Sequence, residues 1–331
     1  MARAVELVAD GDCAAAEPQL RRMLDEQLAD PAQLHHYLGV CRQGEGDLAG
    51  AEVEYREALR LNPALFESIN NLGVVLGELG RHEESLAVLG MLVQAFPAEA
   101  SAHYNLGFEQ AQAGDLEAAL ASFRRAADLD DCGTDALLQA SDLLRVLGRA
   151  DERIAALQEA SRRVPGDGVV AVALTRVLRE AGRNDEAAQV LQAATGSAAN
   201  DGRVLAALAL ELRDLGRIDE ALAAATEALA RSVDDPEGSR IAALACAVIA
   251  RGAGRQAEAE AALRVGVERL PDEPGLAFFL GGLLAEQGRC DEATPVLKRA
   301  LEIYAASEPD GPQATELRRA LAACGAAPAT P

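Results

Sequence analysis

Few side chains in this sequence are of types that carry out chemistry, and asparagines are the first regular set among them. Asn71 and Asn105 lie 34 residues apart, each followed by Leu-Gly, and Asn70 precedes the first of them. A carboxamide donates and accepts hydrogen bonds at the same time, so it can pair with a peptide group whatever side chain that peptide carries. The alternative is that the Asn-Leu-Gly run is a repeated packing motif without a ligand.

Arginines form a second series with nearly the same spacing. Guanidinium groups in a row suit carboxylates or phosphates, because each presents a planar pair of donors. The alternative is structural, since a cation in the last turn of a helix interacts favourably with the exposed carbonyl groups. Neighbouring Asp142, Glu180, Glu211 and Asp214 could also neutralise the row. The series comprises Arg145, Arg176, Arg179, Arg213 and Arg251.

Patterns typical of catalysis or metal binding are missing from the sequence. His35, His36, His103 and Cys41 have suitable residue types, but no HxxxE, HExxH or CxxC spacing supports a metal site. The sequence also lacks a glycine-rich phosphate loop, a nucleophile elbow and a paired carboxylate motif. We therefore expect a protein that is not an enzyme and that holds no metal ion and no cofactor.

A repeat with a period close to 34 residues runs through the chain. Seven of the eight intervals between successive members of a glycine series are 34 or 35 residues, and the interval from Gly216 to Gly254 is 38. Self-similarity at this period is typical of stacked two-helix units. The series comprises Gly11, Gly46, Gly80, Gly114, Gly148, Gly182, Gly216, Gly254 and Gly288.

The positions of one repeat have distinct physical roles when the glycine is numbered 15. Small residues recur at positions 8 and 20, where two antiparallel helices can approach closely, and position 24 is bulky in most units. Glycine at position 15 can adopt the left-handed conformation that ends the first helix. An acidic pair such as Asp219-Glu220 begins the second helix. Prolines at position 32 end it, and these are Pro63, Pro97, Pro165 and Pro271.

These positions resemble the tetratricopeptide repeat family, whose 34-residue helix-turn-helix has small residues at positions 8, 20 and 27 and proline at 32. The segments NNLGVVLGELGRHEESLAVLGMLVQAFP and YNLGFEQAQAGDLEAALASFRRAADLD match best. The resemblance covers residues 1 to about 307. It implies an all-α fold, a right-handed α-solenoid of about nine stacked repeats of which the first is partial. Arg153 departs from the family at position 20, which is normally small.

The resemblance also implies a concave groove lined by positions 2, 5, 6, 9, 12 and 13 of each first helix. In relatives that hold extended peptides, asparagines at position 6 bind the backbone of the ligand, and Asn71 and Asn105 occupy that position. Aromatic and imidazole groups around them could form pockets for side chains. The expected peptide-binding groove comprises His36, Tyr37, Asn70, Asn71, Tyr104, Asn105, Phe108, Arg145, Arg176, Arg179, Arg213 and Arg251.

Composition limits the classes of partner. The chain has 331 residues with 31 Lys and Arg against 53 Asp and Glu, a formal net charge of −22, which disfavours nucleic acids and anionic membranes. No stretch approaches the roughly 20 apolar residues of a membrane span, and acidic residues interrupt the N-terminus before a signal-peptide core can form. We expect a cytoplasmic protein. Its six cysteines lack paired spacing, so we expect reduced thiols at Cys13, Cys41, Cys132, Cys246, Cys290 and Cys324.

The end of the repeat array and one insertion in it have their own signals. The residues DDPEGS at 234–239 account for the longer interval and suggest a longer loop between repeats. Residues 308–324 contain QATELRRALAAC, which we interpret as a capping helix, and residues 325–331 as a disordered tail. A polar end disfavours stacking between chains, so we expect a monomer.

The leading hypothesis is a scaffold or adaptor without chemistry of its own. It would hold an extended segment of a partner protein in the groove. Acidic groups of that segment could pair with Arg179 and Arg213. A second hypothesis is a substrate-recruiting subunit or targeting domain of a separate enzyme, such as a glycosyltransferase. A third is self-assembly through the terminal helices.

Overall fold

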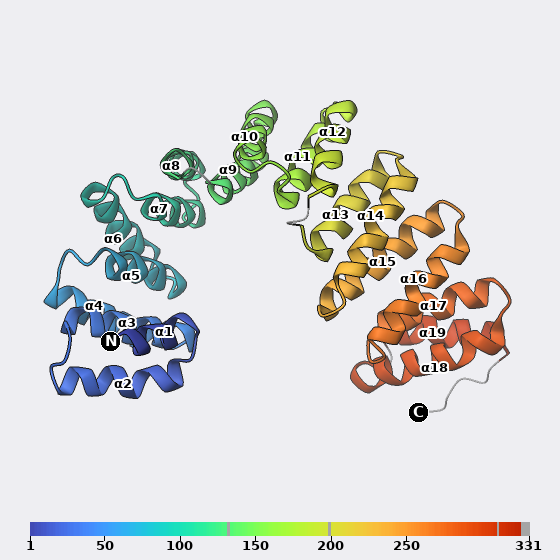
Figure 1. Cartoon of the computed structure of the whole chain (residues 1–331), viewed down its shortest axis with the longest axis horizontal. Helices are drawn as coiled ribbons and strands as arrows, with labels where there is room; N and C mark the ends of the chain where they lie inside the picture. Colours follow the sequence, from blue (N-terminus) through green and yellow to red (C-terminus); the bar gives the residue numbers. More distant parts are fainter. Residues whose placement is uncertain (131–132, 198–199, 310, 326–331) are drawn as a thin grey trace. The chain divides into compact units, whose positions relative to one another are not determined.

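The computed structural model describes residues 1–130, 133–197, 200–309 and 311–325, and the helices α1 to α19 follow one another through these residues without a β-strand (Figure 1). The predicted tail lies outside the described residues except for Gly325, and Cys132 also lies outside them. The helices group into two compact units, Met1–Arg163 and Val164–Pro331, which we call unit 1 and unit 2. The sequence predicts one repeat array over 1–307, and this extent stays a prediction.

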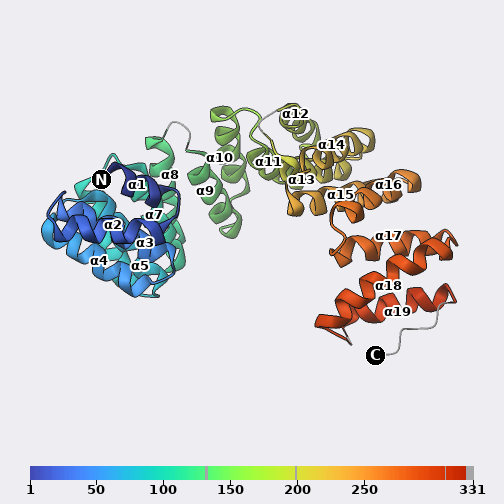
Figure 2. The ribbon, with the colours of Figure 1, turned by 60° about the horizontal axis from the view of Figure 1, so that its bottom comes forward.

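Unit 1 contains ten helices of the described chain, arranged as five successive antiparallel pairs (Figures 1 and 2). The first helix of each pair is odd-numbered, and α1, α3, α5 and α7 contact one another in succession. The bounds are α1 Ala2–Ala9, α2 Cys13–Asp25, α3 Pro31–Gly44, α4 Leu48–Leu61, α5 Phe66–Glu78, α6 His82–Ala95, α7 Ala100–Gln112, α8 Leu116–Leu129, α9 Thr134–Val146 and α10 Ala150–Arg163.

Unit 2 continues the same alternation. Its first helices α11, α13, α15 and α17 again contact one another in succession. The bounds are α11 Gly168–Glu180, α12 Asn184–Thr195, α13 Gly202–Asp214, α14 Ile218–Arg231, α15 Pro236–Gly252, α16 Gln256–Arg269, α17 Pro274–Glu286, α18 Cys290–Ser307 and α19 Pro312–Ala323. The all-α repeat fold is therefore confirmed, whereas its handedness stays a prediction.

The predicted helix ends are confirmed. All nine glycines of the series have φ between 70° and 84°, the left-handed region in which a side chain is disfavoured. The helices α4, α6, α10 and α16 each end two residues before the proline at position 32. At the start of second helices, the Asp47 carboxylate accepts a hydrogen bond from the Gly50 amide at 3.0 Å, which satisfies one free N–H group.

The small residues at positions 8 and 20 mark the closest approach of the paired helices. The Ser85 hydroxyl at position 20 donates to the Gly73 carbonyl at position 8 at 2.7 Å. A Cβ at Gly73 would overlap the side chain of Leu89 at position 24. Arg153 is buried at position 20 and its Nε lies 3.4 Å from the hydroxyl of Ser141 at position 8. A long side chain is therefore accommodated at this crossing through a polar contact.

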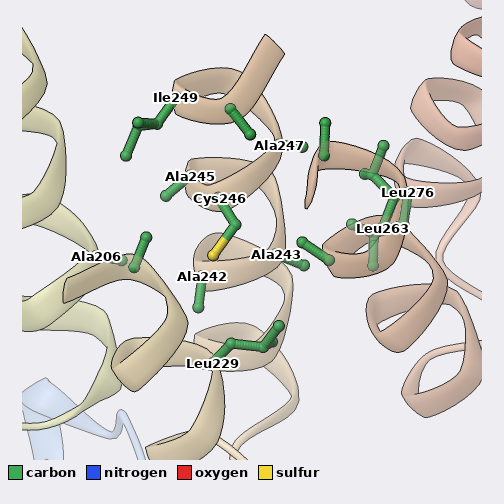
Figure 3. Close-up of a cluster of buried hydrophobic side chains, with 14 of the residues drawn as sticks. Ala206, Leu229, Ala242, Ala243, Ala245, Cys246, Ala247, Ile249, Leu263 and Leu276 are labelled. Atoms are coloured by element: carbon green, nitrogen blue, oxygen red, sulfur yellow. The ribbon is translucent and has the colours of Figure 1, made fainter. Parts of the chain in front are cut away.

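The apolar core of unit 2 is built largely from alanine and leucine. In Figure 3, α15 presents Ala242 toward Ala206 of α13 and Ala243 toward Leu263 of α16. Because alanine lets the helix axes come close, α15 is buried against neighbours on both sides. None of the helices in the described ranges has the length and apolar character needed to cross a bilayer.

The inserted residues 234–239 do not form the long loop that the sequence suggests. The helix α15 begins at Pro236, so the insertion lengthens the first helix to 17 residues. Proline suits the first helical position because its missing N–H would have no partner there. The Ser239 hydroxyl donates to the Ser232 carbonyl at 2.5 Å and ties the added turn to the end of α14.

The expectation of six reduced thiols is wrong for two of them. Cys290 at the start of α18 and Cys324 directly after α19 form a disulfide, with their Cα atoms 5.2 Å apart. The two residues are 34 apart in sequence, and only the packing of α19 against α18 brings them together. Ala314, Leu317 and Leu321 of α19 are fully buried in the unit 2 core, at the place where the sequence predicts a cap.

Candidate functional site

The predicted groove residues of unit 1 lie on neighbouring first helices. We call the side of α3, α5 and α7 that carries positions 2, 5, 6, 9, 12 and 13 the first-helix face of unit 1. It includes seven of the predicted site residues, which are His36, Tyr37, Asn70, Asn71, Tyr104, Asn105 and Phe108. Phe108 is the most open of the aromatic groups, at 48% exposed.

Tyr55 connects the α3 and α5 parts of this face. Its ring is fully buried, and burial raises the pKa of its hydroxyl to about 12, which keeps the hydroxyl proton in place. The Tyr55 hydroxyl donates to Gln43 Oε1 at 3.0 Å and accepts from Asn71 Nδ2 at 3.3 Å. One N–H of Asn71 is therefore engaged inside the fold, which orients the carboxamide.

His36 packs against the same tyrosine. The two ring centroids are 5.8 Å apart, and His36 Nδ1 lies 3.1 Å from the hydroxyl of Ser68 on α5. Burial lowers the pKa of His36, with a smaller opposing effect from the negative charge of Glu67. The neighbouring Tyr37 meets the imidazole edge to face at 5.3 Å.

A direct contact joins the asparagines of α5 and α7. Asn105 Nδ2 donates to Asn70 Oδ1 at 2.9 Å. Within the described part of the chain this is the single hydrogen bond of the Asn105 side chain, so its carbonyl oxygen and second N–H remain free to pair with a ligand.

A cavity of about 470 Å³ opens beside Asn105. Its lining combines aromatic and apolar groups with two carboxylates and one imidazole. The lining residues are Val74, Gly77, Glu78, His82, Leu89, Tyr104, Asn105, Phe108, Glu109 and Gln112. The sequence predicts Tyr104, Asn105 and Phe108 as groove residues, but it does not predict Glu109 and His82, because their positions 10 and 17 lie outside the expected groove positions.

A second cavity of about 310 Å³ lies on the other side of Tyr104. Tyr104 lines both cavities, and its ring is held edge to face against Phe123 at 5.4 Å. The second cavity is bordered by Asp130 and Asp135 among smaller residues of α7 to α9. The face thus has two adjoining hollows that share an aromatic wall.

The predicted arginine row is divided between the units and paired with carboxylates. Arg145 belongs to unit 1 and lies 3.9 Å from Asp142, while the other four arginines belong to unit 2. Three of those four reach a carboxylate of the next first helix, through the pairs Arg176–Glu211 at 3.0 Å, Arg179–Asp214 at 2.8 Å and Arg251–Glu286 at 2.7 Å. Arg213 contacts Asp214 of its own helix at 2.6 Å. Each arginine of the row therefore lies within ion-pair distance of a carboxylate, as the alternative interpretation of the row expects.

Unit 2 has an apolar patch at its groove positions, outside the predicted site residues except for Arg251. Val248 and Phe279 are 45% and 42% exposed, and they line a small cavity of about 50 Å³ with Leu244 and Arg251. The sequence contains an indication of this patch. In the repeats of α15 and α17, positions 5 and 6 carry apolar residues, whereas the α5 repeat carries asparagines there.

The histidines considered for a metal site are separated by their packing. His35 Nδ1 lies 2.7 Å from Glu54, and His103 Nε2 donates to the Pro97 carbonyl at 3.2 Å. Over residues 1–130, 133–197, 200–309 and 311–325, no group of three or more His, Cys, Asp or Glu is placed to hold a metal ion.

Family models described as tetratricopeptide repeat match most of the chain. One model matches residues 1–65, 70–136, 206–274 and 247–312, and a second matches residues 148–211. The chain belongs to the tetratricopeptide repeat family. Its repeats indicate a scaffold for protein–protein interaction.

One curated relative of this tetratricopeptide repeat protein is the BBSome complex member bbs-4 of Caenorhabditis elegans. The two are 30% identical over 109 residues, which cover 33% of this chain and 24% of bbs-4. The chain therefore spans about a quarter of the length of that relative.

Two solved structures are similar to this chain at low sequence identity. The structure of pilF from Pseudomonas aeruginosa is 21% identical, with a TM-score of 0.50, over 65% of this chain and 93% of that chain. A tetratricopeptide repeat protein from Parabacteroides merdae is 18% identical, with a TM-score of 0.48, over 73% of this chain and 96% of that chain. At 21% identity, the likeness to pilF concerns the fold alone.

Proposed function

We propose that this tetratricopeptide repeat protein is a non-catalytic scaffold that binds an extended segment of a partner protein on the first-helix face of unit 1. The observation that carries the proposal is the side chain of Asn105. It is anchored to Asn70 on one side, it retains a free acceptor and donor, and it forms part of the wall of the 470 Å³ cavity. A peptide group can pair with that carboxamide while a neighbouring side chain enters the cavity.

The arginines contribute less to this proposal than the asparagines. An acidic group of a partner would have to displace Glu211, Asp214 or Glu286 from its existing ion pair. The exchange of one carboxylate for another supplies little net free energy. The binding determinants that we propose are therefore Asn71, Asn105, Tyr104 and Phe108. We also propose that the protein is a monomer and acts in the cytoplasm.

The test is affinity enrichment from native cell extract followed by mass spectrometry, with the wild type and an Asn71→Ala/Asn105→Ala variant as baits. We expect partners that the double variant loses while it remains folded, with a modest fall in melting temperature because the bonds from Asn71 to Tyr55 and from Asn105 to Asn70 are removed. Asn184→Ala, an exposed asparagine at the start of α12, is the matched control and should retain all partners. Equal recovery by the double variant would contradict binding on this face.

A second candidate is a substrate-recruiting subunit or targeting domain of a separate enzyme, such as a glycosyltransferase. It is favoured by the relative bbs-4, whose name makes it a member of a complex. Recovery of one enzyme in stoichiometric amount with the wild-type bait would support this candidate, and recovery of non-enzymatic partners alone would exclude it.

A further inference from the structure

We propose that the 470 Å³ cavity between α5 and α7 binds a lysine or arginine side chain of the partner segment. The inference rests on the proposed function, because it assigns a residue class to the segment held by Asn105. Three observations support the inference independently: the buried carboxylate of Glu109, the negative charge around it, and the apolar and aromatic lining of the cavity.

Glu109 supplies a held carboxylate in the cavity wall. It is 5% exposed, and its Oε1 lies 2.6 Å from His82 Nδ1, so one oxygen is fixed by the imidazole. The other oxygen lies over Gly77, where a Cβ would overlap it. The carboxylate therefore has a defined position before any ligand arrives, which lowers the entropy lost on binding.

The surroundings of Glu109 are acidic. Glu78 adds a second, exposed carboxylate to the lining, and His82 is the one basic side chain among the residues that line the cavity. The groove positions of α3, α5 and α7 contain no lysine and no arginine, but they include Glu67 as well as Glu78. The adjoining cavity beyond Tyr104 is lined by two further aspartates. An acidic ligand group would be repelled here, and a neutral apolar group would desolvate carboxylates without compensation.

The remaining lining fits the stem of a long cationic side chain. Val74 and Leu89 offer apolar contacts for methylene groups, and the exposed ring of Phe108 lies in the same wall. Lysine and arginine bury their stems along such surfaces and keep the charged group near carboxylates or over an aromatic face. A cationic side chain satisfies the apolar and the charged parts of this cavity at once.

The test uses a phage-displayed library of random 12-residue peptides as the probe and the full chain as the bait. Selections are run with the wild type, with Glu78→Gln/Glu109→Gln and with Asn71→Ala/Asn105→Ala. The glutamine at 109 keeps an acceptor for His82, so we expect the fold to be retained. The matched control is Glu258→Gln/Glu268→Gln, which removes the same charge from exposed positions of α16 in unit 2.

We expect lysine or arginine to be enriched at one position of the selected peptides with the wild type and the control, and not with Glu78→Gln/Glu109→Gln. In a synthetic selected peptide, replacing that lysine by norleucine should weaken binding at least tenfold to the wild type and less than twofold to the variant. Higher salt should also weaken the wild-type interaction.

Other outcomes separate this inference from the proposed function. If the selected peptides lack the cationic residue but are lost with Asn71→Ala/Asn105→Ala, the face binds peptides and the inference is overturned. If the asparagine variant selects the same peptides as the wild type, or the wild type selects none, the proposed function itself fails.

Discussion

At the scale of single residues, His36 shows how a groove side chain can also affect stability. Burial lowers the pKa of its imidazole below the ordinary value of 6.5. The unfolded chain therefore binds more protons than the folded chain just below that pH, and stability rises with pH in this range. The contribution is fully present above about pH 6.5 and is lost as the pH falls toward the folded-state pKa.

We expect the free energy of unfolding, measured by urea titration at pH 7.5 and pH 5.5, to contain a part that falls as the pH falls and that depends on His36. On going from pH 7.5 to pH 5.5, the wild type should therefore lose more stability, or gain less, than His36→Gln, because glutamine does not titrate. His103→Gln, which removes a histidine with an exposed hydrogen bond, is the comparison for replacing a histidine by glutamine elsewhere in unit 1. An identical pH dependence in wild type and His36→Gln would show that His36 makes no such contribution.

At the scale of helix pairs, two adjacent glycines of α17 make a matched test of the packing rule. A Cβ at Gly281, at position 8, would overlap Leu297 of α18, whereas a Cβ at Gly282 would meet nothing within 4 Å. We expect Gly281→Ala to destabilise the protein by roughly 1–3 kcal/mol through overpacking. Gly282→Ala should stabilise it by about 0.5–1 kcal/mol, because alanine is the better helix former.

Chemical denaturation followed by circular dichroism measures both changes. Since the two substitutions add the same methyl group to neighbouring residues of one helix, helix propensity cancels in the comparison. Equal effects of the two would mean that α17 and α18 are not in close contact at position 8.

At the scale of the whole molecule, the disulfide should act locally. Each repeat of such an array contacts mainly its neighbours, so a change at one end travels a short way. Cys290 and Cys324 close α19 onto α18, and a loop of this length is worth roughly 3–4 kcal/mol in the chain-entropy estimate. We expect reduction by tris(2-carboxyethyl)phosphine to raise amide hydrogen exchange in α18 and α19 and to leave Met1–Arg163 unchanged.

Hydrogen-exchange mass spectrometry provides the measurement, and Cys324→Ser provides the control. The variant should exchange like the reduced wild type and should not respond to the reductant. Faster exchange throughout unit 1 would contradict local coupling, and unchanged exchange in α19 would show that its apolar contacts suffice without the bond.

Much of the candidate site follows from the 34-residue period. Asn71 and Asn105 share a face because equal spacing puts them at the same place on successive first helices, and Tyr104 and Phe108 lie one helical turn apart beside them. Glu109 and His82 could not be selected in this way. Their contact joins position 10 of one repeat to position 17 of the repeat before, and it depends on Gly77 leaving room for the carboxylate.

The sequence by itself determined the features that arise from local sterics and helix periodicity. These include the left-handed glycines, the helix ends before prolines and the small residues at the helix crossings. Only the tertiary structure decided which distant groups meet, as in the disulfide of α18 and α19, the arginine pairs of unit 2 and the helical start of α15. The physical reason is that local conformation depends on neighbouring residues in the chain. Pairing across repeats depends instead on side-chain directions and on helix separations that packing of the whole core sets.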